Sequence, residues 1–207
     1  MNEYVESLER EFSSIGNGFK EEEKRAFTDY KSNDSEFIKK LAFLSYQSEV
    51  YQVRMYSVFL FGYLSEDKNI LMFLRDEVSK DSNWRVQEVL AKSFDEFCKI
   101  IGYEKALPVI DDWLKNSNHN TRRAVTEGLR IWTGRPYFKA NPNEAIRRLA
   151  ALRDDPSEYV RKSVGNALRD ISKKYPELIR VELSTWSLET KGIKQVYQLA
   201  NKLLIKS

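Results

Sequence analysis

The chain of 207 residues has little of several residues on which other classes of protein depend. It contains 8 Gly and 5 Pro, so long uninterrupted helices are favoured over folds rich in tight turns. One cysteine, Cys98, cannot form an internal disulfide, as is usual in a reducing cytoplasm. With a single histidine, His119, the chain also lacks the ligands of an ordinary His/Cys zinc site.

Long apolar runs are missing too. No stretch of about 18 apolar residues occurs, so we expect no membrane span and no membrane partner. The first residues, MNEYVESLEREF, are polar and acidic, which argues against a secretory signal. We therefore expect a cytoplasmic protein.

Charge is distributed unevenly along the chain. Residues 1–80 carry 11 Lys/Arg against 15 Asp/Glu, whereas residues 81–207 carry 23 against 16. The later part is therefore basic, and it favours an anionic partner for that part only.

Apolar residues recur with helical spacing, and one pattern of core positions repeats along the chain. Each copy places its core residues at positions 0, 4, 7 and 8. Successive copies begin at Val53, Val86, Thr121, Val160 and Gly192, which are 33, 35, 39 and 32 residues apart. Self-similarity near 35 residues with two helices per copy is typical of an α-solenoid.

The predicted fold class is therefore all-α, an α-solenoid of helical-pair repeats. The first helices of three pairs are expected over 66–80, 103–116 and 141–153, bounded by polar segments rich in Asp, Ser and Asn, which cap helices. We expect a single repeat domain over 1–207, with divergent helices in 1–50, repeats in 51–190 and a C-terminal helix in 191–207.

One charged stripe runs along the second helices of three repeats. Positions 2, 6, 9 and 13 lie opposite the core, since each residue advances a helix by about 100°. Seven of these twelve positions are basic and three are acidic. Stacked helices would turn the stripe into a concave, basic groove facing DNA, although any solvated helix face also shows such charges. The predicted DNA-binding residues are Arg123, Arg130, Lys162, Asn166, Arg169 and Lys173.

Three carboxylates form a diagonal along nearly the same face. Glu88 lies at position 2 of its repeat, Glu127 at position 6 and Asp170 at position 10. A carboxylate there repels phosphate, so it has either an ion-pair role, with Arg130 or Arg169 as partner, or a chemical one.

Aromatic residues accompany the carboxylates. Trp84 lies one turn before Glu88, and Trp132 closes the helix of Glu127, shortly before Arg135. We predict that Trp84, Trp132 and Arg135 contact DNA, the two indoles by stacking on a base or sugar. Packing between repeats is the alternative for both indoles.

Three segments resemble the HEAT-like DNA alkylation-repair glycosylases of the AlkC and AlkD types. They are NWRVQEVLAKSFDEF (83–97), TRRAVTEGLRIWTGRPYFKANP (121–142) and LRDDPSEYVRKSVGNALRDISKKYPELI (152–179). The resemblance implies a groove for duplex DNA and hydrolysis of the N-glycosidic bond of N3- or N7-alkylated bases. It implies Glu88, Asp170 and Glu127 as the candidate catalytic acids, with Glu88 and Asp170 preferred to Glu127. It also implies Trp84 as the aromatic residue before the catalytic acid, and no metal or organic cofactor. We expect a monomer.

Two other functions stay open. Glu88 stands where the AlkD-type pattern has Asp, and the leading segment is short and acidic, with Glu21, Glu22 and Glu23. The block WTGRPYFK also resembles a divergent branch that binds distorted or branched DNA without base excision. A protein-binding HEAT scaffold would explain the repeat but not the matched carboxylates.

Overall fold

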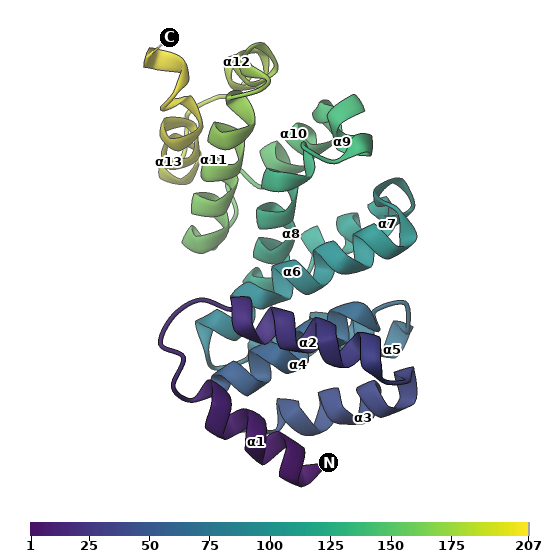
Figure 1. Ribbon diagram of the computed structural model, residues 1–207. Helices are drawn as coiled ribbons and strands as arrows, with labels where there is room; N and C mark the ends of the chain where they lie inside the picture. Colours follow the sequence, from purple (N-terminus) through teal and green to yellow (C-terminus); the bar gives the residue numbers. More distant parts are fainter. Residues whose placement is uncertain (207) are drawn as a thin grey trace. The chain divides into compact units, whose positions relative to one another are not determined.

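A computed structural model describes residues 1–206 and is helical along its length (Figure 1). No β-strand occurs within these residues. Two short 3-10 helices, η1 (Val78–Lys80) and η2 (Leu204–Lys206), accompany the α-helices. The α-helices are α1 (Asn2–Phe12), α2 (Lys20–Ser32), α3 (Ser35–Tyr46), α4 (Tyr51–Tyr63), α5 (Lys68–Asp76), α6 (Trp84–Ile101), α7 (Tyr103–Leu114), α8 (His119–Trp132), α9 (Pro136–Ala140), α10 (Pro142–Ala151), α11 (Glu158–Ser172), α12 (Pro176–Ser184) and α13 (Lys191–Asn201).

The predicted helical pairs are confirmed. The second helices α4, α6, α8, α11 and α13 each begin within two residues of the expected starts. The expected first helices correspond to α5 with η1, α7 and α10. The pattern did not reveal α3 and α12, the first helices of the outer pairs, or the short α9. Residues 1–50 do form additional helices, α1, α2 and α3.

The repeat pattern has a direct structural cause. Its core positions in α4, α6, α8 and α11 are buried, because the second helices within each unit pack against one another and against their first helices. Burial of apolar surface stabilises by about 25 cal/mol per Å². In the looser copy on α13, Val196 and Ala200 are fully buried while Gly192 is only partly so.

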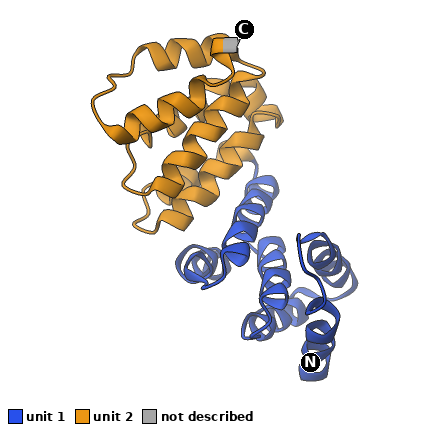
Figure 2. Ribbon diagram, turned by 90° about the vertical axis from the view of Figure 1, so that its left-hand side faces the viewer, with its two compact units in different colours: residues 1–102 blue, residues 103–207 orange. Residues whose placement is uncertain are grey.

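The chain divides into two compact units (Figure 2). Unit 1 is Met1–Gly102 and unit 2 is Tyr103–Ser207. In unit 1, α4 packs against α2, α3 and α6, whereas in unit 2, α11 packs against α8 and α13. Gly102 lies at the boundary with φ of +89°, a conformation that glycine adopts without the steric penalty of a Cβ. The single domain over 1–207 stays a prediction.

Each unit contains the same arginine clamp, which the sequence analysis did not identify. Arg54 binds carbonyl oxygens of the loop before its own helix at 2.9 and 3.1 Å, and both carboxylate oxygens of Asp81 at 2.9 and 3.1 Å. Arg122 binds its preceding loop at 2.7 and 3.0 Å and both oxygens of Asp155 at 2.7 Å. Gln87 occupies the same position on α6 and donates to the Asp81 carbonyl at 2.6 Å. The clamp therefore ties neighbouring repeats within a unit.

No helix among the described residues is long and apolar enough to cross a membrane.

Candidate nucleic-acid interface

The first turn of α6 carries the candidate residues of unit 1. The Asp81 carboxylate accepts from the Asn83 backbone N–H at 2.8 Å, and the Asn83 side chain accepts from the Arg85 N–H at 2.9 Å. These bonds satisfy backbone donors that have no partner inside the helix. The helix therefore starts at a fixed residue, and Trp84 is its first position.

Trp84 is exposed to solvent over 55% of its surface. The Arg85 guanidinium lies 4.4 Å from the Trp84 ring and 5.5 Å from the ring of Tyr51, which opens α4. An indole with this exposure leaves a large apolar surface in water. The packing alternative for Trp84 is therefore not what the structure shows.

Glu88 lies one turn further along α6 and is exposed. Its carboxylate forms no hydrogen bond or ion pair within the described residues. Lys92, the next member of the stripe, pairs with Glu23 of α2 at 3.4 Å and lies 4.7 Å from the Phe19 ring. Asp95 lies at position 9 of this repeat, where the stripe predicts an exposed residue. That prediction is wrong, because Asp95 is buried and pairs with Lys99 at 3.1 Å.

In unit 2, Glu127 is held by hydroxyl groups and an arginine. The Ser163 hydroxyl of α11 donates to Glu127 at 2.8 Å, and the Thr126 hydroxyl lies 2.7 Å from that of Ser163. Arg130, one turn along α8, contacts the other oxygen of Glu127 at 3.4 Å. The Ser163 hydrogen bond thus joins α8 to α11 through the carboxylate, while the ion pair with Arg130 lies within α8.

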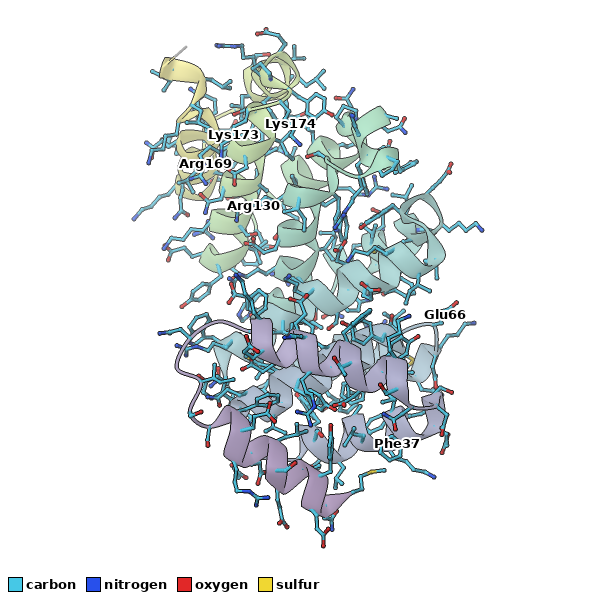
Figure 3. The ribbon with its side chains drawn as sticks, in the orientation of Figure 1. Phe37, Glu66, Arg130, Arg169, Lys173 and Lys174 are labelled. Atoms are coloured by element: carbon cyan, nitrogen blue, oxygen red, sulfur yellow. The ribbon has the colours of Figure 1, made fainter. Side chains whose placement is uncertain are left out.

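Asp170 pairs with three cations of unit 2, Arg130, Arg169 and Lys173, and Figure 3 labels these three cations. Arg130 contacts it at 2.6 Å, Lys173 at 3.0 Å and Arg169 at 3.3 Å. Burial alone would raise the pKa of Asp170, but hydrogen bonds from Lys173, Arg169 and Arg130 outweigh it and lower the pKa. Asp170 is therefore held as an anion, and its partners hold it in place.

Burial also acts on the pKa of Arg130, which it would lower by itself. The contacts with the carboxylates of Asp170 and Glu127 together outweigh burial, so the pKa of Arg130 is raised. The cluster Arg130, Arg169, Lys173, Glu127 and Asp170 carries three positive and two negative charges. A surplus of positive charge is thus available at the surface of α8 and α11.

The prediction that Trp132 contacts DNA is wrong, and the packing alternative holds for this residue. It is fully buried and packs on Tyr103 and Phe138, with ring centroids 5.5 and 5.8 Å away. Gly128 lies under the indole, since a Cβ at that position would come 2.4 Å from the ring. Trp132 therefore cannot stack on a base, and its role is in the core of unit 2.

The other predicted DNA-binding residues of unit 2 differ in exposure. Lys162 is exposed and pairs with Glu158 at 2.8 Å. The half-buried residues are Arg123, Arg135 and Asn166. Their contact with DNA stays a prediction.

Lys174 is a cation that the stripe did not include. It follows Lys173 beyond the end of α11, and its Nζ lies 3.7 Å from the position of a Cβ on Gly134. Figure 3 shows Lys174 in the same part of unit 2 as Lys173, Arg169 and Arg130. The Lys-Lys pair at 173–174 was the available signal, but helical periodicity places only Lys173 on the stripe.

The carboxylates thus fall on different units. Glu127 and Asp170 are joined through Arg130 in unit 2, whereas Glu88 belongs to unit 1. Their convergence in one groove stays a prediction. Within the described residues, no group of three or more His, Cys, Asp or Glu is arranged to hold a metal ion.

Residues 17–185 match the model of the family described as "DNA alkylation repair enzyme". This segment includes both α6 and the charged cluster of unit 2. The chain belongs to the DNA alkylation repair enzyme family.

Three individual proteins are similar to this chain. The crystal structure of AlkD2 from Streptococcus mutans is 75% identical, with a TM-score of 0.96 over 97% of each chain. YhaZ of Bacillus subtilis (strain 168) is 36% identical over 91 residues, which are 42% of this chain and 26% of YhaZ. The matched segment thus spans about a quarter of that curated relative.

The third relative is more distant. It is the alkylpurine DNA glycosylase AlkC from Pseudomonas fluorescens, bound to DNA containing an abasic site analog. The identity is 22% and the TM-score 0.53, over 91% of this chain and 62% of that one. Together with AlkD2, it shows that the helical-repeat fold predicted from the sequence is the fold of this family.

Proposed function

We propose that the protein binds duplex DNA and hydrolyses the N-glycosidic bond of N3- or N7-alkylated bases. The observation that carries the proposal is the position of an exposed indole, Trp84, one turn before Glu88 on α6, whose carboxylate has no partner in the described part of the chain. Membership of the alkylation-repair family supports the same activity.

DNA binding is supported by the cations of unit 2. Arg130, Arg169, Lys173 and Lys174 lie together at the surface of α8 and α11. Such a surplus of Lys and Arg attracts the phosphate backbone independently of sequence. A relative of the same fold, AlkC, is described in complex with DNA.

Cleavage of the glycosidic bond needs little catalysis of base departure, because an alkylated base carries a positive charge and leaves readily. The C1′–N bond breaks, and its electron pair neutralises the base. Water adds to C1′ and gives its proton to the Glu88 carboxylate. A carboxylate also stabilises the positive charge that develops on the sugar, and the Trp84 indole provides a face for the sugar or base.

Asp170 has a different role in this proposal. Three cations hold its carboxylate and lower its pKa, so it neither accepts a proton at neutral pH nor lies open to a sugar. We assign it a positioning role, since it fixes Arg130, Arg169 and Lys173 at the surface. Glu127 is similarly engaged by Ser163 and Arg130.

Release of methylated bases tests the catalytic step. Wild-type protein should liberate 3-methyladenine, 7-methylguanine or 3-methylcytosine from methylated DNA, and Glu88→Gln should lower the rate by roughly 100-fold or more, the scale of losing one electrostatic stabiliser. Glu21→Gln, an exposed glutamate of α2, is the matched control. No release by excess wild-type protein would contradict the activity.

DNA binding is measured separately. Arg123→Ala combined with Arg169→Ala should weaken affinity for duplex and flatten its dependence on salt, because fewer counterions are released. Retained binding without base release would leave a non-catalytic binder of distorted or branched DNA. Absence of any salt-sensitive DNA affinity would instead favour a protein-binding scaffold.

A further inference from the structure

The acidic leading segment presents a basic surface, because its acids and its lysines fall on different sides of α2. Each residue advances the helix by about 100°. Lys20, Lys24, Phe27 and Lys31 therefore lie within an arc of about 60°, which we call the α2 strip. All four are exposed, and Phe27 leaves 49% of its surface in water.

The neighbouring acids are directed elsewhere. Glu22 is fully buried against unit 1, and Glu23 pairs with Lys92 of α6 at 3.4 Å. Asp29 is buried and accepts hydrogen bonds from Tyr4 and Tyr56, each at 2.7 Å. Glu21 is the remaining exposed acid of the first turn, and it lies at least about 60° from the strip.

The lysines of the strip have no acidic partner within the described residues. Lys20 and Lys24 form no ion pair, and Lys31 lies 5.5 Å from the rings of both Phe27 and Tyr30. Among the other exposed lysines of unit 1, Lys40 pairs with Glu36 and Lys80 with Glu77, whereas Lys68 forms no ion pair within the described residues. The strip therefore carries uncompensated positive charge.

The strip adjoins the residues already proposed for DNA. Lys92, which holds Glu23 beside the strip, lies one turn after Glu88 on α6. An aromatic group continues the surface, since Tyr63 at the end of α4 stacks on Tyr30 at 4.9 Å and meets Phe27 edge-on at 6.0 Å. Phe27 is exposed and the two tyrosines are half-buried, and lysines that flank such an aromatic group suit a backbone of phosphates and sugars.

We infer that the α2 strip is a second DNA contact, in which three lysines bind phosphates of the duplex and Phe27 contacts a deoxyribose. This inference rests on the proposed DNA-binding function. It extends the interface to a segment that the charge count of residues 1–80 excluded.

Affinity for a short fluorescein-labelled duplex, measured by anisotropy over a series of salt concentrations, tests the inference. The variant Lys20→Ala/Lys24→Ala/Lys31→Ala should lower the slope of log affinity against log salt concentration by about 2 to 3, because each phosphate contact contributes about 0.9. Affinity at low salt should fall by roughly tenfold or more.

The matched control is Lys40→Ala/Lys68→Ala/Lys80→Ala. It removes the same charge from exposed positions of the first-helix segments in unit 1 and should retain the wild-type slope. Phe27→Ala should weaken binding with an unchanged slope, whereas Met72→Ala, which removes a similarly exposed apolar side chain of α5, should have no effect.

The outcomes separate this inference from the proposed function. If the strip variant binds like its control while Arg123→Ala/Arg169→Ala loses affinity, the α2 contact is wrong and DNA binding by unit 2 stands. If the wild-type protein shows no salt-sensitive affinity, both are wrong. Thermal unfolding of each variant, expected to match wild type because the altered residues are exposed, confirms that the comparison concerns folded protein.

Discussion

The two units have the same repeat architecture and opposite charge. Residues 1–102 carry 14 Lys/Arg against 19 Asp/Glu, and residues 103–207 carry 20 against 12. Yet acids of unit 1 such as Glu22, Asp29 and Asp95 are buried, whereas in unit 2 the cations gather around Asp170 at the surface. The placement of charges, rather than their number, decides which surface meets a polyanion.

The candidate carboxylates differ in the same way. Glu88 of unit 1 is exposed beside an exposed indole, and nothing described holds its carboxylate. Asp170 of unit 2 is held by three cations. An open carboxylate suits chemistry at a sugar, and a bound one suits the positioning of arginines and lysines. In the proposed function, the two units thus divide two tasks that the diagonal pattern had grouped together.

The largest expected loss of stability comes from breaking the arginine clamp of unit 2, in which Arg122 pairs with Asp155. Arg122→Met should destabilise the protein by about 3 to 5 kcal/mol, because it leaves the buried Asp155 carboxylate without its partner. Gln87→Met removes only a neutral hydrogen bond to Asp81 and should cost about 1 kcal/mol. Urea unfolding followed by circular dichroism gives both values. Equal losses would show that the ion pair adds nothing to the clamp.

The next largest loss of stability is expected from a substitution at Gly128 in unit 2. Gly128→Ala should destabilise by about 2 kcal/mol, because its Cβ would overlap the buried, rigid indole of Trp132 and the core must shift. Gly16→Ala in unit 1 has open space around it, so the change should stay within about 0.5 kcal/mol. The same unfolding measurement applies. A neutral Gly128→Ala would mean that Trp132 repacks without cost.

These effects show where sequence reasoning succeeds and where it stops. Periodicity predicted the second helices, because burial imposes the same spacing on every repeat. It could not predict that Trp132 turns inward, since an indole at a helix end satisfies the pattern of either face. The Arg54–Asp81 and Arg122–Asp155 clamps join residues 27 and 33 positions apart, and only the fold brings such residues together.

Asp170 provides a smaller effect that depends on pH. Its pKa is lowered in the folded protein, so its contribution to stability is present at neutral pH and is lost as the pH falls through that lowered value. Asp170→Asn should therefore cost about 1 to 2 kcal/mol at pH 7 and little in strong acid. Urea midpoints across this range give the difference. A loss that is equal at all pH values would contradict the ion-pair role.

Glu22 of unit 1 should show the opposite dependence of stability on pH, and the smallest change in stability of this series. Its carboxylate is fully buried in unit 1 without a hydrogen-bond partner, and burial raises its pKa, with a further contribution from Glu21. The folded state therefore favours the protonated acid. The contribution of Glu22 to folding stability is fully present below the ordinary pKa of glutamic acid, about 4.3. This contribution is lost as the pH rises through the raised pKa of Glu22 in the folded protein.

Glu22→Gln should consequently stabilise the protein at pH 7 by roughly 1 kcal/mol, because no buried charge has to form. The gain should shrink toward pH 4, where the wild-type acid is already neutral. Glu21→Gln, at the exposed neighbouring position, should change stability by less than about 0.5 kcal/mol at either pH. A Glu22→Gln variant that is less stable at pH 7 would show that the carboxylate gains a partner or water in solution. Opposite pH dependences for Glu22 and Asp170 would then no longer distinguish the two units.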